Sequence, residues 1–268
     1  MMIKRKIYFC TYADSKKYDI SAKHLIKMTK KSGLFSSSVI YTQNDLDVEF
    51  KQRFSETLSH SRGGGYWLWK HHVIEKELKK AKENDFIVYS DAGSSFNYHA
   101  VKRFNEYIEM LNNSDYGTFR IEGLKSHLEK YYTKKEIFDY FDLEPEGSQG
   151  TTVQYMGGHL IFQKNDHTYE FLKVLKKMIE YKIEFITDHH NKEIQIEEFI
   201  ENRHDQSLMS IISKLIGTVS VENETYFDKN SNKQYAYPFL SVRHYGHGLR
   251  ERSSYYLKMK KYREPIYF

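Results

Sequence analysis

The sequence predicts an α/β protein with a mostly parallel central sheet flanked by helices. Short apolar runs of strand length alternate with helical patterns over the first 110 residues, which is typical of βαβ units. One of these runs, residues 85–90, ends directly at Asp91. We find no internal repeat and no clear linker. We therefore expect a single domain over residues 1–268, with a basic, aromatic tail from about residue 250.

The composition excludes several classes of protein. Hydrophobic residues make up 40% of the chain and charged residues 29%, which excludes a disordered protein, and no apolar run is long enough to cross a bilayer. A net charge of +5 is mild for a dedicated nucleic-acid binder. Cys10 is the only cysteine, so no internal disulfide can form. Without a signal-peptide pattern at the N-terminus, we expect a cytoplasmic protein.

The C-terminal tail has a different charge pattern. Its lysines and arginine stand among tyrosines with few acidic neighbours: Lys258, Lys260, Lys261 and Arg263. Such a tail can contact anionic lipid headgroups at the inner face of a membrane. The alternative is the exposed end of a surface helix.

The elements of the first half follow from periodicity and from breakers. Strands are predicted at residues 6–11 (KIYFCT), 38–42 (SVIYT) and 85–90 (DFIVYS). A helical pattern begins near Ile20 and ends at Gly33. Further helical spacings run over residues 50–58, 66–78 and 101–111, the second of them after the flexible Gly63–Gly65 hinge.

The second half is less regular. A helix is predicted over residues 129–141, and a strand over 154–162 in which Gly157 and Gly158 allow close backbone approach. Amphipathic helices are predicted at residues 171–179 and 208–215, and a last strand after Tyr235. The histidine pairs His71-His72 and His189-His190 are interpreted as surface residues, because adjacent side chains on a regular element point apart.

Asp91 is the strongest candidate for a functional residue. Ligands of open parallel sheets bind at the carboxyl ends of the strands, and a carboxylate there can hold a ribose hydroxyl or a divalent metal. Ala92 and Gly93 follow it directly. The alternative is that Asp91 caps the next helix or simply ends a strand.

Two further segments can serve a nucleotide. Arg62 and Lys70 flank the glycine hinge, where cations and the amides of Gly63–Gly65 can hold a pyrophosphate. Thr11, Tyr12 and Ala13 follow the first strand, where Tyr12 can stack on a base. A simple turn is the alternative for residues 11–13. Trp67 and Trp69 are assigned to the core, with a platform for the substrate as the alternative.

The order of these segments resembles that of GT-A glycosyltransferases, especially relatives of the lipopolysaccharide galactosyltransferases and glycogenin. The matching segments are KIYFCTYADS, then GGGYWLWKHHVIEKEL leading into DFIVYSDAG, then YMGGHLIF and HDQSLMSII. The GYWLWK block followed by Asp-Ala-Gly also resembles bacterial and viral transferases of surface polysaccharides, including galactofuranosyltransferases. The resemblance covers roughly residues 6–212.

The resemblance implies a GT-A-like, Rossmann-like fold. It also implies transfer of a sugar from a nucleotide-sugar donor to a glycan or glycolipid acceptor in polysaccharide synthesis, and a UDP-linked donor is the expected one. The implied donor contacts are Thr11, Tyr12, Ala13, Arg62, Lys70, Asp91, Ala92 and Gly93. The implied acceptor contacts are Gly157, Gly158, His204 and Gln206. Asp205, in the Asp-Gln motif, is the implied catalytic residue.

The chain departs from the family pattern at Gly93, which stands where the second Asp of Asp-x-Asp usually binds the metal. Mn²⁺ or Mg²⁺ is still the expected cofactor. Either Asp91 holds it with water, or His244 and His247 complete the site, or metal dependence is weak. The alternative for the two histidines is a surface loop.

Asp205 permits two interpretations. It directly precedes an apolar helix, so it can be an N-cap whose carboxylate accepts from the first amides. A carboxylate fixed there can also orient an acceptor hydroxyl and take its proton. Two other functions remain open for the chain, a nucleotidyltransferase acting on sugar phosphates and a binding module for glycan or nucleic acid. The absence of glycine after the first strand argues against the nucleotidyltransferase.

Overall fold

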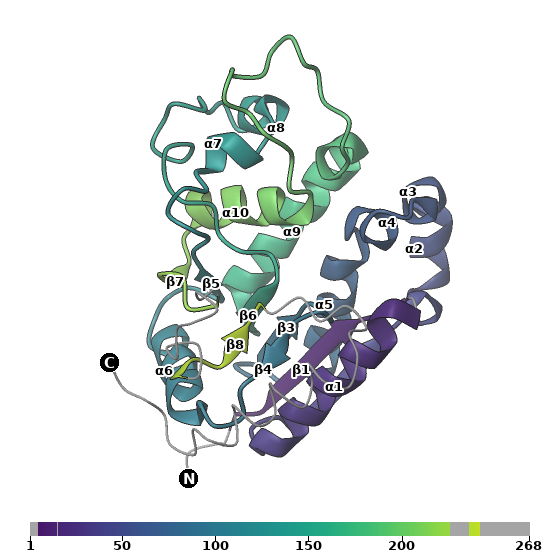
Figure 1. The fold of residues 1–268 in the computed structure, drawn as a ribbon, viewed down its shortest axis with the longest axis vertical. Helices are drawn as coiled ribbons and strands as arrows, with labels where there is room; N and C mark the ends of the chain where they lie inside the picture. The colour runs from purple at the N-terminus through teal and green to yellow at the C-terminus, as the bar shows by residue number, and fades with distance from the viewer. Residues whose placement is uncertain (1–4, 15, 226–235, 242–268) are drawn as a thin grey trace.

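The computed structural model describes residues 5–14, 16–225 and 236–241, and its centre is a six-stranded sheet of order β2-β1-β3-β6-β5-β7 (Figure 1). The strands are β1 (Ile7–Tyr12), β2 (Ser37–Tyr41), β3 (Phe86–Ser90), β5 (Thr118–Ile121), β6 (His159–Gln163) and β7 (Val219–Val221). A two-stranded sheet pairs β4 (Ser95–Phe96) with β8 (Phe239–Leu240). The predicted α/β class with a mostly parallel sheet is confirmed.

The direction of β6 brings two distant loops to the same edge of the sheet. β1 is parallel to β2 and β3, and β5 is parallel to β7, but β6 is antiparallel to both of its neighbours. The last residue of β3, Ser90, therefore pairs with the first residue of β6, His159. As a result the loop that begins at Asp91 lies against the Gly157-Gly158 turn.

Helices cover both faces of the sheet (Figure 1). The longer ones are α1 (Lys16–Ser32), α5 (Trp69–Lys80), α6 (Val101–Asn112), α9 (Asp166–Tyr181) and α10 (Asp205–Ile216). The side chains of β3 point alternately to the two faces of the sheet, and their contacts show which helices cover each face. Phe86 and Val88 pack with residues of α1 and α6, while Ile87 and Tyr89 pack with residues of α5, α9 and α10. The sheet is thus buried on both faces, as parallel sheets usually are.

Shorter helical segments complete the described chain. They are η1 (Gln43–Asp45), α2 (Val48–Arg53), α3 (Ser55–Ser59), α4 (Gly63–Tyr66), α7 (Glu129–Tyr132), α8 (Lys135–Tyr140) and η2 (Ile183–Ile186). Among all helices of the described residues, none is long and apolar enough to cross a membrane. The basic tail from about residue 250, for which a membrane contact is expected, lies outside the described residues.

Two of the predicted elements are wrong in extent. The strand expected at residues 154–162 is only β6 (His159–Gln163), because Gly157 and Gly158 form a turn that packs against α10. The helix expected at residues 129–141 is broken at Thr133 and Lys134, whose backbones are extended. The Lys134 ammonium instead donates to carbonyls of the 184–189 segment, which stabilises the break.

The expectation that His71 and His72 lie on the surface is also wrong. Both are buried, and Phe50 packs against both rings. Burial lowers the pKa of His71 to about 3, so this imidazole is neutral at physiological pH. The two histidines are therefore part of the buried surface of α5, and most other residues of this helix are buried as well.

Candidate functional site

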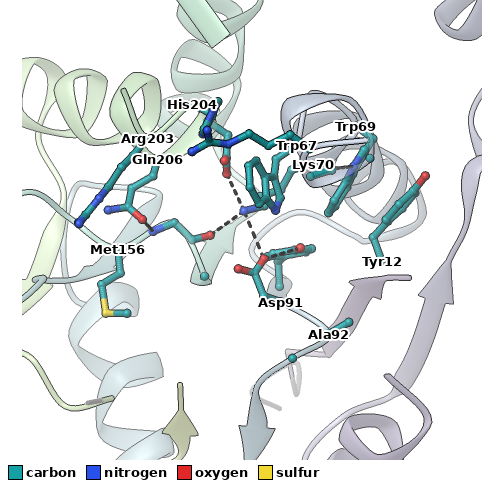
Figure 2. Close-up of a pocket in the computed structure, with 18 of the residues that line it drawn as sticks. Tyr12, Trp67, Trp69, Lys70, Asp91, Ala92, Met156, Arg203, His204 and Gln206 are labelled. Carbon is teal, nitrogen blue, oxygen red and sulfur yellow. Dashed lines mark hydrogen bonds and ion pairs between the residues drawn. The ribbon is translucent and has the colours of Figure 1, made fainter. Parts of the chain in front are cut away.

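A cavity of about 1140 Å³ opens at the edge of the sheet where β1 and β3 end and β6 begins. Most residues implied by the family resemblance line it: Tyr12, Arg62, Lys70, Asp91, Ala92, Gly93, Gly157, Gly158, His204, Asp205 and Gln206. In Figure 2, Tyr12 and Ala92 lie on one side of Lys70 and Asp91, and Met156, Arg203 and Gln206 lie on the other. The cavity therefore has two sides that meet at this pair.

The centre of the cavity is a buried ammonium group between two carboxylates. Lys70 Nζ lies 2.6 Å from Asp205 Oδ2 and 3.3 Å from Asp91 Oδ1. It also donates to the carbonyl of Gly157 at 3.0 Å. Burial by itself would lower the pKa of Lys70, but Asp205 and Asp91 outweigh it, and the pKa is raised. Lys70 is therefore charged.

A left-handed turn delivers Lys70 to this position. Residues 63–67 all have positive φ, between 54° and 94°, which glycine adopts freely and other residues do not. Gly65 is also confined, since a Cβ there would come within 2.7 Å of Leu58 Cα. Tyr66 and Trp67 pay a conformational cost at these angles, and both rings pack against His204.

The same turn changes the role expected of the glycine amides. Gly64 N donates to Ser61 O, and Gly65 N donates to His60 O. These two amides are already used inside the turn, so in this conformation they are not free to hold a pyrophosphate, as was expected of them. Trp69 is buried as predicted, while Trp67 is only partly buried and lines the cavity.

Asp91 is fixed on one side and open on the other. Its Oδ1 accepts from the Tyr89 hydroxyl at 2.8 Å and its amide donates to Gly158 O at 2.9 Å. The side chain is 40% exposed. Asp91 does not cap a helix, because α6 begins only at Val101 after an Ala100 N-cap. Of the two alternatives left by the sequence, a carboxylate that faces a ligand fits this geometry.

Asp205 is not an N-cap, which corrects one interpretation of the sequence. It is the first residue of α10, and His204 holds the N-cap position. Its carboxylate pairs with Lys70 instead, and only 7% of the side chain is exposed. Burial, opposed by Lys70 and reinforced by Asp91, raises the pKa of Asp205 to about 6. A carboxyl with this pKa is suited to accept a proton near neutral pH.

Gly157 and Gly158 lie in the site because no side chain fits there. A Cβ on Gly157 would come within 2.8 Å of Gln206 Cβ, and one on Gly158 within 3.1 Å of Asp91 Oδ2. Gly157 N also donates to Gln206 Oε1 at 3.2 Å, and Gln206 Nε2 donates to Gln154 Oε1 at 2.7 Å. These contacts hold the start of α10 close to the end of β3.

The expected nucleoside residues are only partly exposed to the cavity. Tyr12 lines it, but one face of its ring is stacked on Trp69 with centroids 3.8 Å apart. Thr11 and Ala13 are buried beside it and do not line the cavity. Arg62 lines the cavity and is paired with Asp188 at 2.9 Å and Glu201 at 3.3 Å.

Several lining residues were missed by sequence reasoning. Asp14, Tyr18 and Gln43 line the side of Tyr12, and two of these follow the first two parallel strands closely. Because ligands bind at the carboxyl ends of parallel strands, the positions of Asp14 after β1 and Gln43 after β2 could have indicated them as site residues. On the other side Met156, His127 and Arg203 line the cavity. Arg203 lies 3.4 Å above the Tyr132 ring, and nothing local in the sequence indicates this.

Asp91 offers one carboxylate oxygen to a divalent cation. Asp91 Oδ1 is engaged by Tyr89 and Lys70, which leaves Oδ2 beside Gly158. Within the described ranges no three His, Cys, Asp or Glu side chains come together as a metal-binding group. Mg²⁺ is commonly bound by one or two carboxylates together with substrate phosphates and water, and Asp91 fits that mode. His244 and His247 lie outside the described residues.

Comparison with known proteins supports the fold. No protein-family profile matches the chain, and no curated protein matches it in sequence. The WbbM bifunctional glycosyltransferase structure aligns with a TM-score of 0.50 at 10% identity, over 82% of this chain and 39% of that one. The present chain therefore spans well under half of WbbM, and what they share is the fold.

Two other solved structures align less well. One is a glycosyltransferase involved in glycosylation of the major capsid of PBCV-1, with a TM-score of 0.46, 12% identity, and coverage of 96% of this chain and 99% of that one. The other is mouse xyloside xylosyltransferase 1, with a TM-score of 0.46, 8% identity, and coverage of 81% and 85%.

Proposed function

We propose that the protein is a glycosyltransferase of GT-A type that acts in surface polysaccharide synthesis. It moves a sugar from a nucleotide-sugar donor, for which we propose a UDP-sugar, to a glycan or glycolipid acceptor. The observation that carries the proposal is the pair of carboxylates, Asp91 and Asp205, held by one buried ammonium where the two sides of the cavity meet. The fold shared with WbbM supports it. A cytoplasmic location, with the tail touching the membrane, is part of the same proposal.

The donor is proposed to bind on the side of Tyr12, Asp14 and Gln43, with its diphosphate near Asp91. The two carboxylates and Lys70 together carry a net charge of about −1, which repels a diphosphate in a partly dry site. We therefore propose Mn²⁺ or Mg²⁺ held through Asp91 Oδ2, with His244 and His247 as further candidate ligands. When bound, such an ion neutralises the leaving diphosphate.

The acceptor is proposed to enter on the other side, along Gly157, Gly158, His204 and Gln206, with Met156 and Arg203 as an additional wall. In an inverting transfer the acceptor oxygen forms a bond to the anomeric carbon while the bond to the diphosphate breaks. Asp205 then takes the hydroxyl proton. This role requires Asp205 as a carboxylate, which it is above its pKa of about 6.

UDP with Mn²⁺ is expected to raise the melting temperature of the protein, whereas UDP with a chelator should raise it much less. At a ligand concentration 100 times the dissociation constant the gain in unfolding free energy is about 2.7 kcal/mol. Thermal-shift titration against UDP, GDP, CDP and ADP measures this. If no nucleoside diphosphate or nucleotide sugar shifts the melting temperature, the proposed donor site does not exist.

Transfer is expected to slow as the pH falls through about 6. Burial and Asp91 raise the pKa of Asp205 to that value although Lys70 opposes them, so below it Asp205 becomes protonated and cannot accept the acceptor proton. The measurement is kcat/KM between pH 5 and 8. The Asp205→Asn variant should show a residual rate without this acidic limb, and an identical limb in that variant would assign the titration to another group.

A further inference from the structure

Lys70 lies where the sequence suggested a ligand for the pyrophosphate, but its surroundings are different from those of a phosphate ligand. Its side chain is only 2% exposed. An ammonium group has three donors, and Lys70 has three acceptors within reach: Asp205 Oδ2 at 2.6 Å, Gly157 O at 3.0 Å and Asp91 Oδ1 at 3.3 Å. The contact with Gly157 O is a hydrogen bond and the two carboxylate contacts are ion pairs, so the ammonium charge is already paired and its side chain is almost fully covered.

The three acceptors belong to three different segments. Asp91 follows β3, Gly157 precedes β6, and Asp205 begins α10, while Lys70 itself comes from the first turn of α5. Figure 2 shows the dashed contacts converging on Lys70 from the Asp91 side and from the side of Gln206 and His204. One buried cation therefore ties together the segments that carry the candidate donor and acceptor groups.

Two of these acceptors are carboxylates that repel each other, and one of them, Asp205, is shielded from water. Without a cation between them, ionisation of the buried Asp205 would be opposed by Asp91 as well as by burial. The Tyr89 ring lies 5.1 Å from Lys70 Nζ, and its hydroxyl donates to the same Asp91 oxygen. The ammonium is thus held from several directions, which fixes its position and that of its partners.

We propose that Lys70 is a positioning residue that locks Asp91 and Asp205 into one constellation and does not itself bind the donor diphosphate. Its catalytic consequence rests on the proposed function, because it requires that Asp91 serves the donor and Asp205 the acceptor. The lock itself is a property of the described structure alone. The two parts are tested by different measurements.

The first measurement separates positioning from donor binding in Lys70→Met. The variant should lower kcat at least about 100-fold, because Asp205 loses the group that holds and charges it. The Kd of UDP with Mn²⁺ should stay within about threefold or tighten, since the variant removes no donor contact and removes a positive charge near Asp91. A large rise in this Kd with little change in kcat would overturn the proposal and make Lys70 a diphosphate ligand.

The matched control is Lys76→Met on the same helix. Lys76 pairs at the surface with Asp47 at 2.6 Å and does not line the cavity. The Lys76→Met variant should have the kcat and the donor Kd of the wild-type protein. Comparable loss of kcat in both variants would mean that removing any lysine of α5 disturbs the helix, and would overturn a specific role for Lys70.

The second measurement does not need activity. Lys70→Met leaves Asp205 buried without its main partner and should lower Tm by about 6 to 12 °C. Adding Asp205→Asn removes the carboxyl that has lost its partner, so the double variant should lose clearly less than the sum of the two single losses. A double variant whose loss equals the sum of the single losses would overturn the lock. Lys70→Met that folds only together with Asp205→Asn would support it.

The two measurements also distinguish the two hypotheses from each other. If the wild-type protein binds no nucleoside diphosphate and transfers no sugar, the proposed function fails, and the stability cycle still decides whether Lys70 locks the carboxylates. If transfer is found but the stability losses add, the proposed function stands and the lock fails.

Discussion

Asp205→Asn is expected to slow sugar transfer at least about 100-fold while donor binding is retained. Asparagine has nearly the same shape and keeps an oxygen that can accept from Lys70, so the contact between α5 and α10 survives in weaker form. It cannot take a proton from the acceptor. Since Asp205 is not the N-cap of α10, the substitution does not remove a cap. The measurement is kcat together with the Kd of UDP and Mn²⁺.

Asp166→Asn provides a matched control for this variant. Asp166 is the first residue of α9, as Asp205 is of α10, but it is exposed and does not line the cavity. Asp166 experiences the dipole of α9 as Asp205 experiences that of α10, but it has no partner equivalent to the buried Lys70. We expect normal transfer from it. Near-normal transfer by Asp205→Asn would make Asp205 a structural partner of Lys70 only.

Asp91→Asn is expected to slow transfer by about 10²- to 10³-fold, the range found when one electrostatic contact to a transition state is removed. It should also abolish the part of the UDP stabilisation that depends on Mn²⁺, because Asp91 Oδ2 is the carboxylate oxygen proposed to hold the cation. Its side chain is 40% exposed, so the loss of charge should affect stability little.

Asp115→Asn, in the exposed turn between α6 and β5, is the control for a lost surface carboxylate. It should transfer sugar and respond to Mn²⁺ as the wild-type protein does. The decisive readout is the difference in UDP-induced melting shift with and without Mn²⁺. If Asp91→Asn keeps that difference, the cation is held elsewhere, and His244 and His247 become the next residues to substitute.

Local pattern predicted the elements that carry the donor side of the site. The strand expected at residues 85–90 is β3 (Phe86–Ser90), and the helix expected at residues 101–111 is α6 (Val101–Asn112). Both have complete hydrophobic periods and clear ends, which are properties of contiguous residues. Because Asp91 directly follows β3, its place at the cavity could also be predicted from the sequence.

The interpretation of Asp205 shows where local pattern is insufficient. An acidic residue before an apolar helix is a common N-cap pattern, and the sequence favoured neither that interpretation nor a catalytic one decisively. The choice depends on Lys70, which is distant in the sequence and meets Asp205 only when α5 and α10 come together in the folded chain. The same tertiary packing buries His71 and His72, which were expected at the surface because adjacent side chains on a regular element point apart.

The sequence by itself determined the α/β class, the strand that ends at Asp91 and most of the segments that meet in the cavity. Only the tertiary structure decided that the Lys70 ammonium lies between Asp91 and Asp205, that Gly157 and Gly158 form a turn before β6, and that the glycine turn is left-handed. The physical reason is that hydrophobic periods and turn residues act between neighbours in the chain. A buried ion pair instead depends on where distant segments are brought together and on how completely water is excluded there.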